Sequence, residues 1–332
     1  MNGFPTQARI MSSTFIKAAE VWLPSEDGTL LEFGGGAFGP ARRFAAISRE
    51  MCFGRGEGLP GRAWDEGRPV LLPRFEGSNF RRVSAARDAG LACAVALPLF
   101  VHDSLSSVLV IFCGPDAVAD AASGLELWHH DARITSDMRL VDGAFFGANA
   151  QAFESASRDT YLPRGVGLPG AAWQRGEAVF LENLPAVPGR FLRAQEAAEA
   201  GLLRGLAIPA GSKLEDSHVL SFLADAKLPL ARRIERWVPD AAGALLRRVY
   251  AFSELHGGAS LIEATLPASA SASVTAGSIV EAWRSAMPAI NDFPASEPGA
   301  PAAAATAIGS WALLAIPVVW GDEVVEVVAL YL

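Results

Sequence analysis

The chain has 332 residues, of which 51% are hydrophobic and 19% are charged, so it belongs among globular proteins of two or three domains and not among disordered chains. Its formal net charge of -8 speaks against a nucleic-acid-binding surface, because contact with phosphates needs clustered Lys and Arg. The first residues lack the cationic start and apolar core of a signal peptide, and no apolar run is long enough to span a bilayer. We therefore predict a cytoplasmic protein that binds neither nucleic acid nor a membrane.

One heptapeptide occurs twice in the chain. Gly58–Trp64 (GLPGRAW) returns as Gly167–Trp173 (GLPGAAW), and an eroded copy follows at Gly277–Trp283. The copies are about 110 residues apart, which is the length of a whole domain. A Glu also stands two residues before a Trp ahead of each copy, at Glu20 and Trp22, Glu126 and Trp128, and Glu235 and Trp237. The sequence thus predicts three tandem domains, at residues 1–115, 116–226 and 227–332.

Periodicity and turn signals predict the same elements in each copy. In the first copy, a short helix within Pro5–Ala19 precedes a hairpin that contains Trp22 and Thr29–Phe33, and a glycine-rich loop at Gly34–Gly39 leads to a helix. The GLPG segment begins the next helix, since glycine permits positive φ and proline fits a first helical turn. A short strand, a helix closed by Gly90 and a hairpin of two longer strands complete the copy. The predicted fold class is α+β, with a mostly antiparallel sheet and flanking helices in each domain.

The third copy is degenerate. Low-complexity runs at Ala268–Ala276 and Pro294–Ala305 replace the approach to the heptapeptide and the polar helix that carries Arg81 and Arg193 in the other copies. We therefore expect the third domain to be structural.

These patterns resemble the GAF domain family. The residues that carry the resemblance are Gly56, Gly58, Gly61, Trp64 and Ala89-Gly90-Leu91 in the first copy, and Gly165, Gly167, Gly170, Trp173 and Ala200-Gly201-Leu202 in the second. The resemblance covers nearly the whole chain and implies an antiparallel sheet with a small-molecule pocket under the helices of each domain, and a role as a regulatory sensor. Signalling GAF modules usually lie between long helices, whereas only one short helix, within Asp116–Ser123, fits between the first two copies. We therefore expect output through a partner protein or through homo-oligomer assembly.

The resemblance places arginines beside two of the expected pockets. A guanidinium group can hold an anionic ligand with two hydrogen bonds, so these arginines are the predicted ligand-binding residues. They are Arg55, Arg81 and Arg82 in the first copy and Arg164, Arg190 and Arg193 in the second. The alternative is a solvated helix face on which Asp88 or Glu196 pairs with them. The identity of the small molecule stays open.

Three unpaired cysteines suggest free thiols in a reducing compartment. Cys52 borders a second loop, Gly54–Gly58, which leads into the GLPG segment, and is the redox candidate, whereas Cys93 and Cys113 lie in apolar runs and should pack as small hydrophobic groups. Free-methionine-sulfoxide reductases, the enzymatic members of the family, use cysteines near this loop. The resemblance puts Pro60 and roughly Arg87 at those places, so we predict no catalytic residue. No signature of a bilin, haem or metal cofactor is present.

The run His129-His130-Asp131 contains residue types that bind metals. Neighbouring residues of a strand point to opposite faces, so the two histidines do not readily share an ion, and we predict a solvated hairpin turn and no metal site. Three hypotheses follow for the whole chain. The first is a small-molecule sensor that acts on a partner protein, the second is a scaffold whose pockets are filled by its own Trp and Phe side chains, and the third is a thiol-redox enzyme that uses Cys52.

Overall fold

The computed structural model describes residues 13–115, 121–213, 216–258, 263–268 and 277–332. These residues form three six-stranded sheets with eight α-helices. The first domain consists of β1 (Ile16–Pro24), β2 (Leu30–Ala37), α1 (Arg42–Arg49), β3 (Cys52–Gly54), α2 (Gly58–Glu66), β4 (Val70–Leu72), α3 (Val83–Asp88), β5 (Cys93–Val101) and β6 (Ser104–Cys113). Every strand pairing in the three sheets is antiparallel.

The second domain consists of β7 (Ser123–Asp131), β8 (Met138–Phe146), α4 (Ala150–Arg158), β9 (Tyr161–Leu162), α5 (Gly167–Arg175), β10 (Val179–Leu181), α6 (Ala194–Ala200), β11 (Arg204–Lys213) and β12 (Asp216–Ala224). The third consists of β13 (Arg233–Pro239), β14 (Leu245–Ser253), β15 (Thr265–Pro267), α7 (Ser278–Ser285), β16 (Ala289–Asn291), a 3-10 turn (Pro294–Ser296), α8 (Ala300–Ile308), β17 (Leu313–Trp320) and β18 (Glu323–Tyr331). No helix of the described residues has the length and apolarity that a membrane crossing requires.

The three sheets repeat one topology. The strand order β3-β2-β1-β6-β5-β4 of the first sheet returns as β9-β8-β7-β12-β11-β10 and as β15-β14-β13-β18-β17-β16. Trp22, Trp128 and Trp237 occupy the first strand of their sheets and are fully buried. The predicted fold of three tandem α+β, GAF-like domains is therefore confirmed.

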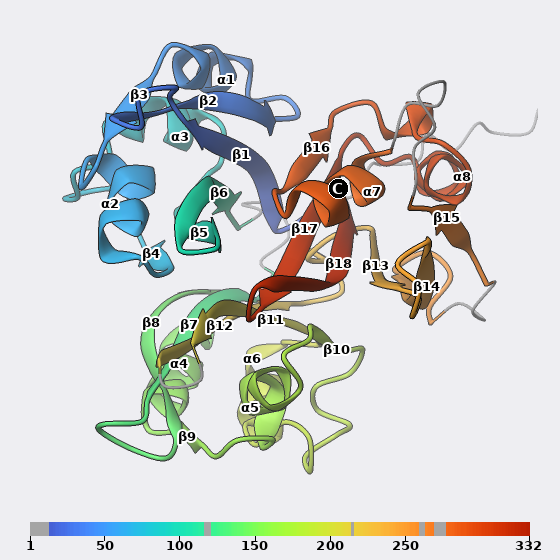
Figure 1. Ribbon diagram of the computed structural model, residues 1–332. Coiled ribbons are helices and arrows are strands. Elements are labelled where there is room, and N and C mark those ends of the chain that lie inside the picture. The colour runs from blue at the N-terminus through green and yellow to red at the C-terminus, as the bar shows by residue number, and fades with distance from the viewer. Residues whose placement is uncertain (1–12, 116–120, 214–215, 259–262, 269–276) are drawn as a thin grey trace, which may run out of the picture.

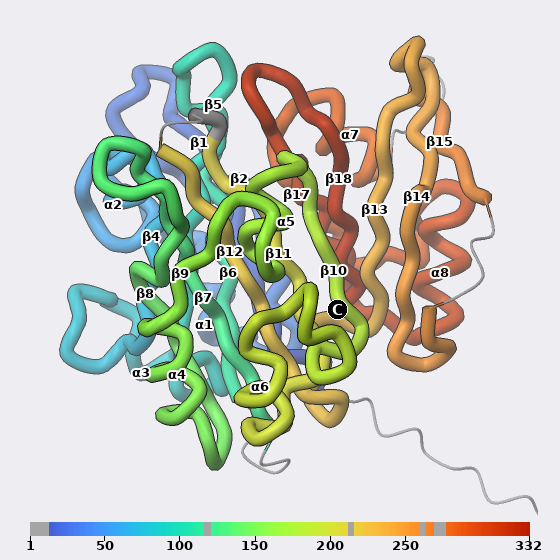
Figure 2. Tube along the Cα trace, turned by 90° about the horizontal axis from the view of Figure 1, so that it is seen from below, coloured from blue at the N-terminus to red at the C-terminus, as the bar shows by residue number. Residues whose placement is uncertain are grey.

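Each sheet has one face covered by its own helices and the other turned to the centre of the molecule. The three sheets surround a common centre in Figure 1, and α2 and α8 lie on opposite sides of the strands in Figure 2. The inner faces pack into one central core to which every sheet contributes, with Leu97 and Ile111 from the first, Leu206 and Phe222 from the second, and Ile316 and Leu330 from the third. Each outer face packs with its helices into a separate core. The central core joins the domains into one body.

The domains contact one another in a closed ring. Strand β4 contacts β8 of the second domain and β16 contacts β2 of the first, which are equivalent junctions. At the third junction, Phe180 of β10 lies with its ring centroid 5.1 Å from that of Phe252 on β14. Each junction joins one surface of a domain to a different surface of the next domain. Such head-to-tail contacts form a closed ring when the rotation from one unit to the next is suitable, so this single polypeptide has the arrangement of a trimer.

The three equivalent junctions carry different side chains. At the junction of domains 2 and 3, the guanidinium group of Arg236 is 2.7 Å from a carboxylate oxygen of Glu326 and 2.7 Å from one of Glu177 across the junction. The equivalent positions are Leu127, His218 and Arg68 at the junction of domains 1 and 2, and Val21, Ser107 and Met287 at that of domains 3 and 1. One junction thus holds an ion pair, the second holds a histidine and an arginine beside a leucine, and the third holds a serine and two apolar side chains.

Two expectations for the start of the chain are wrong. Residues Ile16–Ala19 of the expected first helix lie in strand β1, and the expected glycine-rich loop is largely the end of β2, while residues 5–12 fall outside the described part. The glycines suit a strand because space is short beside them. A Cβ atom at Gly36 would lie 2.7 Å from the ring of Phe38.

The low-complexity run Pro294–Ala305 does not form a loop. It contributes the 3-10 turn and most of α8, since alanine favours helix. Residues 269–276 and 116–120, which include most of the other run and of the expected linker helix, lie outside the described residues, and Ser123 already belongs to β7.

The central core predicts the effect of truncating one of its leucines. Leu220 is 1% exposed within this core, so Leu220→Ala should lower the free energy of unfolding by about 2–5 kcal/mol. The matched control is Leu192→Ala, because Leu192 is 51% exposed and its truncation should change stability by less than about 0.5 kcal/mol. Urea denaturation followed by circular dichroism measures both, and equal effects of the two variants would contradict a shared core.

Candidate functional site

A buried glutamate marks the helix-facing side of each sheet, where a GAF-like pocket would lie. The indole Nε1 of Trp22 donates a hydrogen bond of 3.1 Å to Glu20, and the same bond measures 2.9 Å from Trp128 to Glu126 and 3.0 Å from Trp237 to Glu235. All three carboxylates are fully buried. A buried carboxylate stays charged only with a strong partner, so each needs a cation nearby.

In the first two domains the cation is an arginine from the start of the last helix. Arg82 donates two hydrogen bonds to Glu20, of 2.5 and 3.1 Å, and a third to the hydroxyl of Ser48 on α1. In the second domain Arg193 likewise bonds both oxygens of Glu126 and the hydroxyl of Ser157. Both guanidinium groups are buried and therefore tie the helices to the sheet.

The third domain neutralises its glutamate differently. Helix α8 has no arginine, and Glu235 instead accepts hydrogen bonds from Arg233 at 2.7 Å and Arg248 at 2.8 Å, both of which come from the sheet itself. The hydroxyl of Tyr331 donates a further bond of 3.0 Å. The glutamate and tryptophan are thus common to all three domains, whereas the source of the positive charge is not.

The side chains of the first domain fill the expected ligand pocket. Arg82 lies over the ring of Phe44, 4.4 Å from its centroid, and Phe75 stacks on Phe80 at 4.3 Å. The space left between α2, β3 and Phe80 is a cavity of about 10 Å³, which is enough for about one water molecule. A metabolite does not fit there without rearrangement.

The other predicted ligand-binding arginines are scattered over the surface. Arg81 pairs with Glu57 at 2.7 Å and Arg55 with Asp65 at 3.0 Å, all of them substantially exposed. Arg164 lies over the ring of Trp173, 5.7 Å from its centroid, and Arg190 is exposed. Two of the six arginines, Arg81 and Arg82, lie beside one cavity, the small one described above. A role for these residues in ligand binding stays a prediction, while the geometry gives Arg82 and Arg193 a structural role.

A much larger cavity, of about 370 Å³, lies where the three domains meet. Its walls come from the equivalent strands β5, β11 and β17, which contribute Leu99, Ala210 and Val319 and the equivalent prolines Pro98, Pro209 and Pro317. Strand β4 pairs with β5 only as far as Ala96, and β10 and β16 end equally early on β11 and β17. Each proline thus lies past the end of the short neighbouring strand, where a missing N–H costs no sheet pairing.

Charged groups gather at the rim of this central cavity. Arg68, which pairs with Glu66, and Asp103 come from the first domain, and Asp216 and His218 come from the second. Asp103 lies in the β5–β6 turn with a φ of 62°, a left-handed conformation that Asp tolerates better than most residues. The rim therefore offers both signs of charge above apolar walls.

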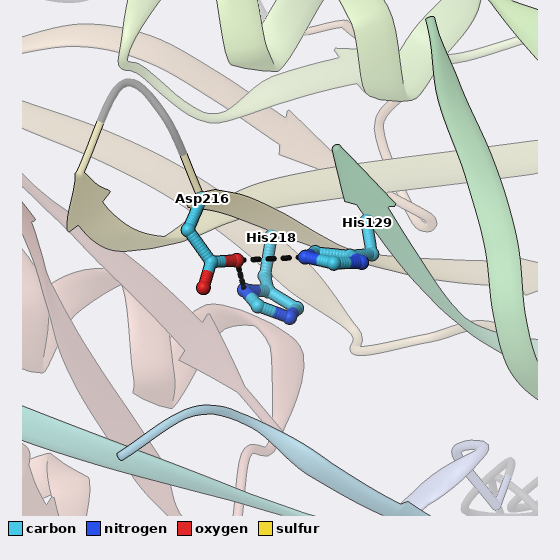
Figure 3. A group of neighbouring side chains, drawn as sticks. All are labelled: His129, Asp216 and His218. Carbon is cyan, nitrogen blue, oxygen red and sulfur yellow. Dashed lines mark hydrogen bonds and ion pairs between the residues drawn. The ribbon is translucent and has the colours of Figure 1, made fainter. Parts of the chain in front are cut away.

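Two histidines and an aspartate meet at the same rim (Figure 3). His129 on β7 lies directly opposite His218 on β12, with ring centroids 4.3 Å apart, and its Nε2 is 2.7 Å from Asp216. Burial, and after it the charge of His129, lowers the pKa of His218 to about 3, so this ring is neutral at pH 7. The expectation of a solvated turn was wrong, because residues 129–131 belong to β7. His129 faces His218 across the sheet and not its sequence neighbour His130, whose ring lies on the other face against Trp173.

Cysteine positions follow the expected pattern of burial. Cys52 is exposed on β3, whereas Cys93 and Cys113 are fully buried in the central core. Burial raises the pKa of the Cys113 thiol well above its usual value, which makes it a poor nucleophile.

The ion pair under the first pocket predicts a large difference between two neighbouring arginines. Arg82→Met should lower the free energy of unfolding by about 3–5 kcal/mol, because it leaves the carboxylate of Glu20 buried without a cation. Adding Glu20→Met should recover most of that loss. Arg81→Met is the matched control, and as an exposed pair it should cost at most about 1 kcal/mol. Chemical denaturation measures the free energy of unfolding of the wild type, the two single variants and the double variant. An Arg82→Met variant as stable as the wild type would rule out the structural role.

Thiol labelling tests the cysteines. A maleimide should modify Cys52 first in the native protein and reach Cys93 and Cys113 only on unfolding, because only Cys52 is exposed. The Cys52→Ser variant should show no rapid labelling phase. A rapid phase that survives this substitution would contradict the assignment.

No family model matches this chain, and neither does any curated protein. Among solved structures, the chain is similar to the NLH2 GAF domain of A. aeolicus, with 17% identity over 30% of this chain and 59% of that chain and a TM-score of 0.25. It is also similar to the second GAF domain of DevS from Mycobacterium smegmatis, with 22% identity over 31% of this chain and 64% of that chain and a TM-score of 0.23. A third similar structure is fRMsr of Staphylococcus aureus, with 21% identity over 30% of this chain and 56% of that chain and a TM-score of 0.23. The chain spans a little over half the length of the first of these structures. Each match extends over about one domain of this chain and carries no information on activity.

Proposed function

We propose that this protein is a non-catalytic cytoplasmic sensor that binds a small molecule and acts on a partner protein. The observation that carries the proposal is the central cavity of about 370 Å³, which falls within the range of known small-molecule sites. The GAF-like fold of the three domains supports a sensing role in general terms.

The central cavity suits a sensor better than the pocket inside the first domain. The latter is filled by aromatic rings, whereas a ligand in the central cavity touches all three domains at Leu99, Ala210 and Val319. A ligand shifts a conformational equilibrium only by the difference in its affinity for the two states. Contacts with three domains at once make that affinity depend on how the domains are placed, which is a change that a partner protein can read.

The lining indicates the chemical class of the ligand. Its walls are prolines and aliphatic side chains, and Arg68 is the cation at the rim. We infer a compact molecule with an apolar body and one anionic group that faces Arg68. The alternative is the scaffold, and the observation in its favour is the filled pocket of the first domain. The thiol-redox hypothesis has one exposed cysteine in its favour, with both other thiols buried.

Two arginine variants distinguish a sensor with its site in the central cavity from the alternatives. Small anionic metabolites are screened by thermal shift against the wild-type protein, Arg68→Ala and Arg81→Ala. A ligand of the central cavity should lose about one to two decades of affinity in Arg68→Ala, because a charge-assisted hydrogen bond contributes roughly 1.5–3 kcal/mol. It should bind Arg81→Ala as it binds the wild type.

The opposite pattern would move the site to the pocket of the first domain. A screen in which no compound shifts the melting temperature of the wild-type protein would favour the scaffold.

A further inference from the structure

The cluster of His129, Asp216 and His218 has the composition and size of a metal site. One donor atom from each residue lies within 4.8 Å of the other two, and the Nδ1 of His218 is 3.8 Å from the Asp216 oxygen that also faces His129. Donor atoms around a tetrahedral ion are roughly 3.3 Å apart, given metal–nitrogen distances near 2.0–2.1 Å. Side-chain shifts of about 1 Å would therefore bring the three donors around an ion.

The sheet itself aligns these three residues. His129 and His218 are cross-strand partners on β7 and β12, and Asp216 is two residues from His218, so all three project from one face. That face is the inner one, because Leu127 and Leu220, two residues further along each strand, belong to the central core. Two well-paired strands hold the ligands, and such a scaffold positions ligands better than a loop does.

We propose that His129, Asp216 and His218 bind one divalent transition-metal ion, such as Zn²⁺ or Co²⁺, at the rim of the central cavity. Two imidazoles and one carboxylate are a donor set typical of such ions when one coordination position stays open for water or another ligand. Asp216 and His218 line the cavity, which places the open position within reach of its contents.

Two further observations support a ligand at this place. His218 is 3% exposed, and its Nδ1, which faces Asp216 in Figure 3, is 3.8 Å from the carboxylate oxygen, which is too far for a hydrogen bond and leaves room for an ion between the two atoms. The charge is also suitable, because Asp103 adds a second carboxylate beside Asp216 to the residues that line the cavity. The equivalent positions on the other sheets are Leu23 and Ser107, and Val238 and Glu326, so we expect one ion per chain.

Cobalt titration of tag-free protein tests the proposal directly. The wild-type protein should develop the visible absorption of tetrahedral Co²⁺, saturate at one ion per chain and lose the band when Zn²⁺ is added. His129→Gln and Asp216→Asn should each weaken binding by at least about tenfold, since even indirect contacts to a metal contribute that much. Their side chains are 21% and 49% exposed, so both variants should keep the wild-type melting temperature.

The matched control is His256→Gln, which removes an exposed histidine far along the chain from the cluster and should bind like the wild type. The proposal fails if the wild-type protein binds no Co²⁺, or if His129→Gln binds as tightly as His256→Gln. No cavity ligand enters this experiment, so its outcome is independent of the proposed sensor function.

Discussion

Each sheet of this protein has two apolar faces but only one layer of helices, so the uncovered faces must be buried against one another. This requirement explains the apolar strands of each repeat, such as Val95–Leu99, in which side chains of both faces are buried. It also explains why three domains form one body and why their helices lie on the outside. The central cavity remains where the inner strands pass beyond their short neighbours and end in proline-containing segments.

The outer faces follow a second constraint, which is the buried glutamate of each first strand. Removing a carboxylate from water costs several kcal/mol unless a cation and hydrogen bonds compensate for it. Arg82 and Arg193 supply that compensation from a helix, whereas Arg233 and Arg248 supply it from the sheet. The same arginines occupy the space between sheet and helices, so the interaction that holds the helices also closes the first pocket.

Much of the architecture could be predicted from the sequence, because glycine, proline and tryptophan recur at fixed intervals. The first strand was mistaken for a helix because Phe15, Ile16 and Ala19 fit one helical face equally well, and a strand buried on both faces shows no alternation. Arg81 and Arg82 were grouped as one site because neighbours in sequence look alike, although one is exposed and the other buried. Arg82 is distinguished from Arg81 by its ion pair with Glu20, which lies 62 residues away in the sequence.

The candidate sites depend on relationships that the sequence carries only indirectly. His129 and His218 could have been paired by setting Trp128 opposite Val219, since the first and last strands of each repeat lie side by side. That step needs the strand order as well as the repeat. The central cavity could not have been predicted, because it exists only in the packing of three domains against one another.

The junctions between the domains differ in a way that a true trimer cannot match. In an assembly of identical subunits, one substitution changes every interface at once, so a group that suits one junction must be tolerated at all of them. Here Glu326, His218 and Ser107 occupy equivalent positions and differ freely. A single polypeptide can therefore keep the closed ring of three domains and still have a given chemical group at only one of its three junctions. The three junctions are thus alike in backbone arrangement but different in the chemical groups that they hold.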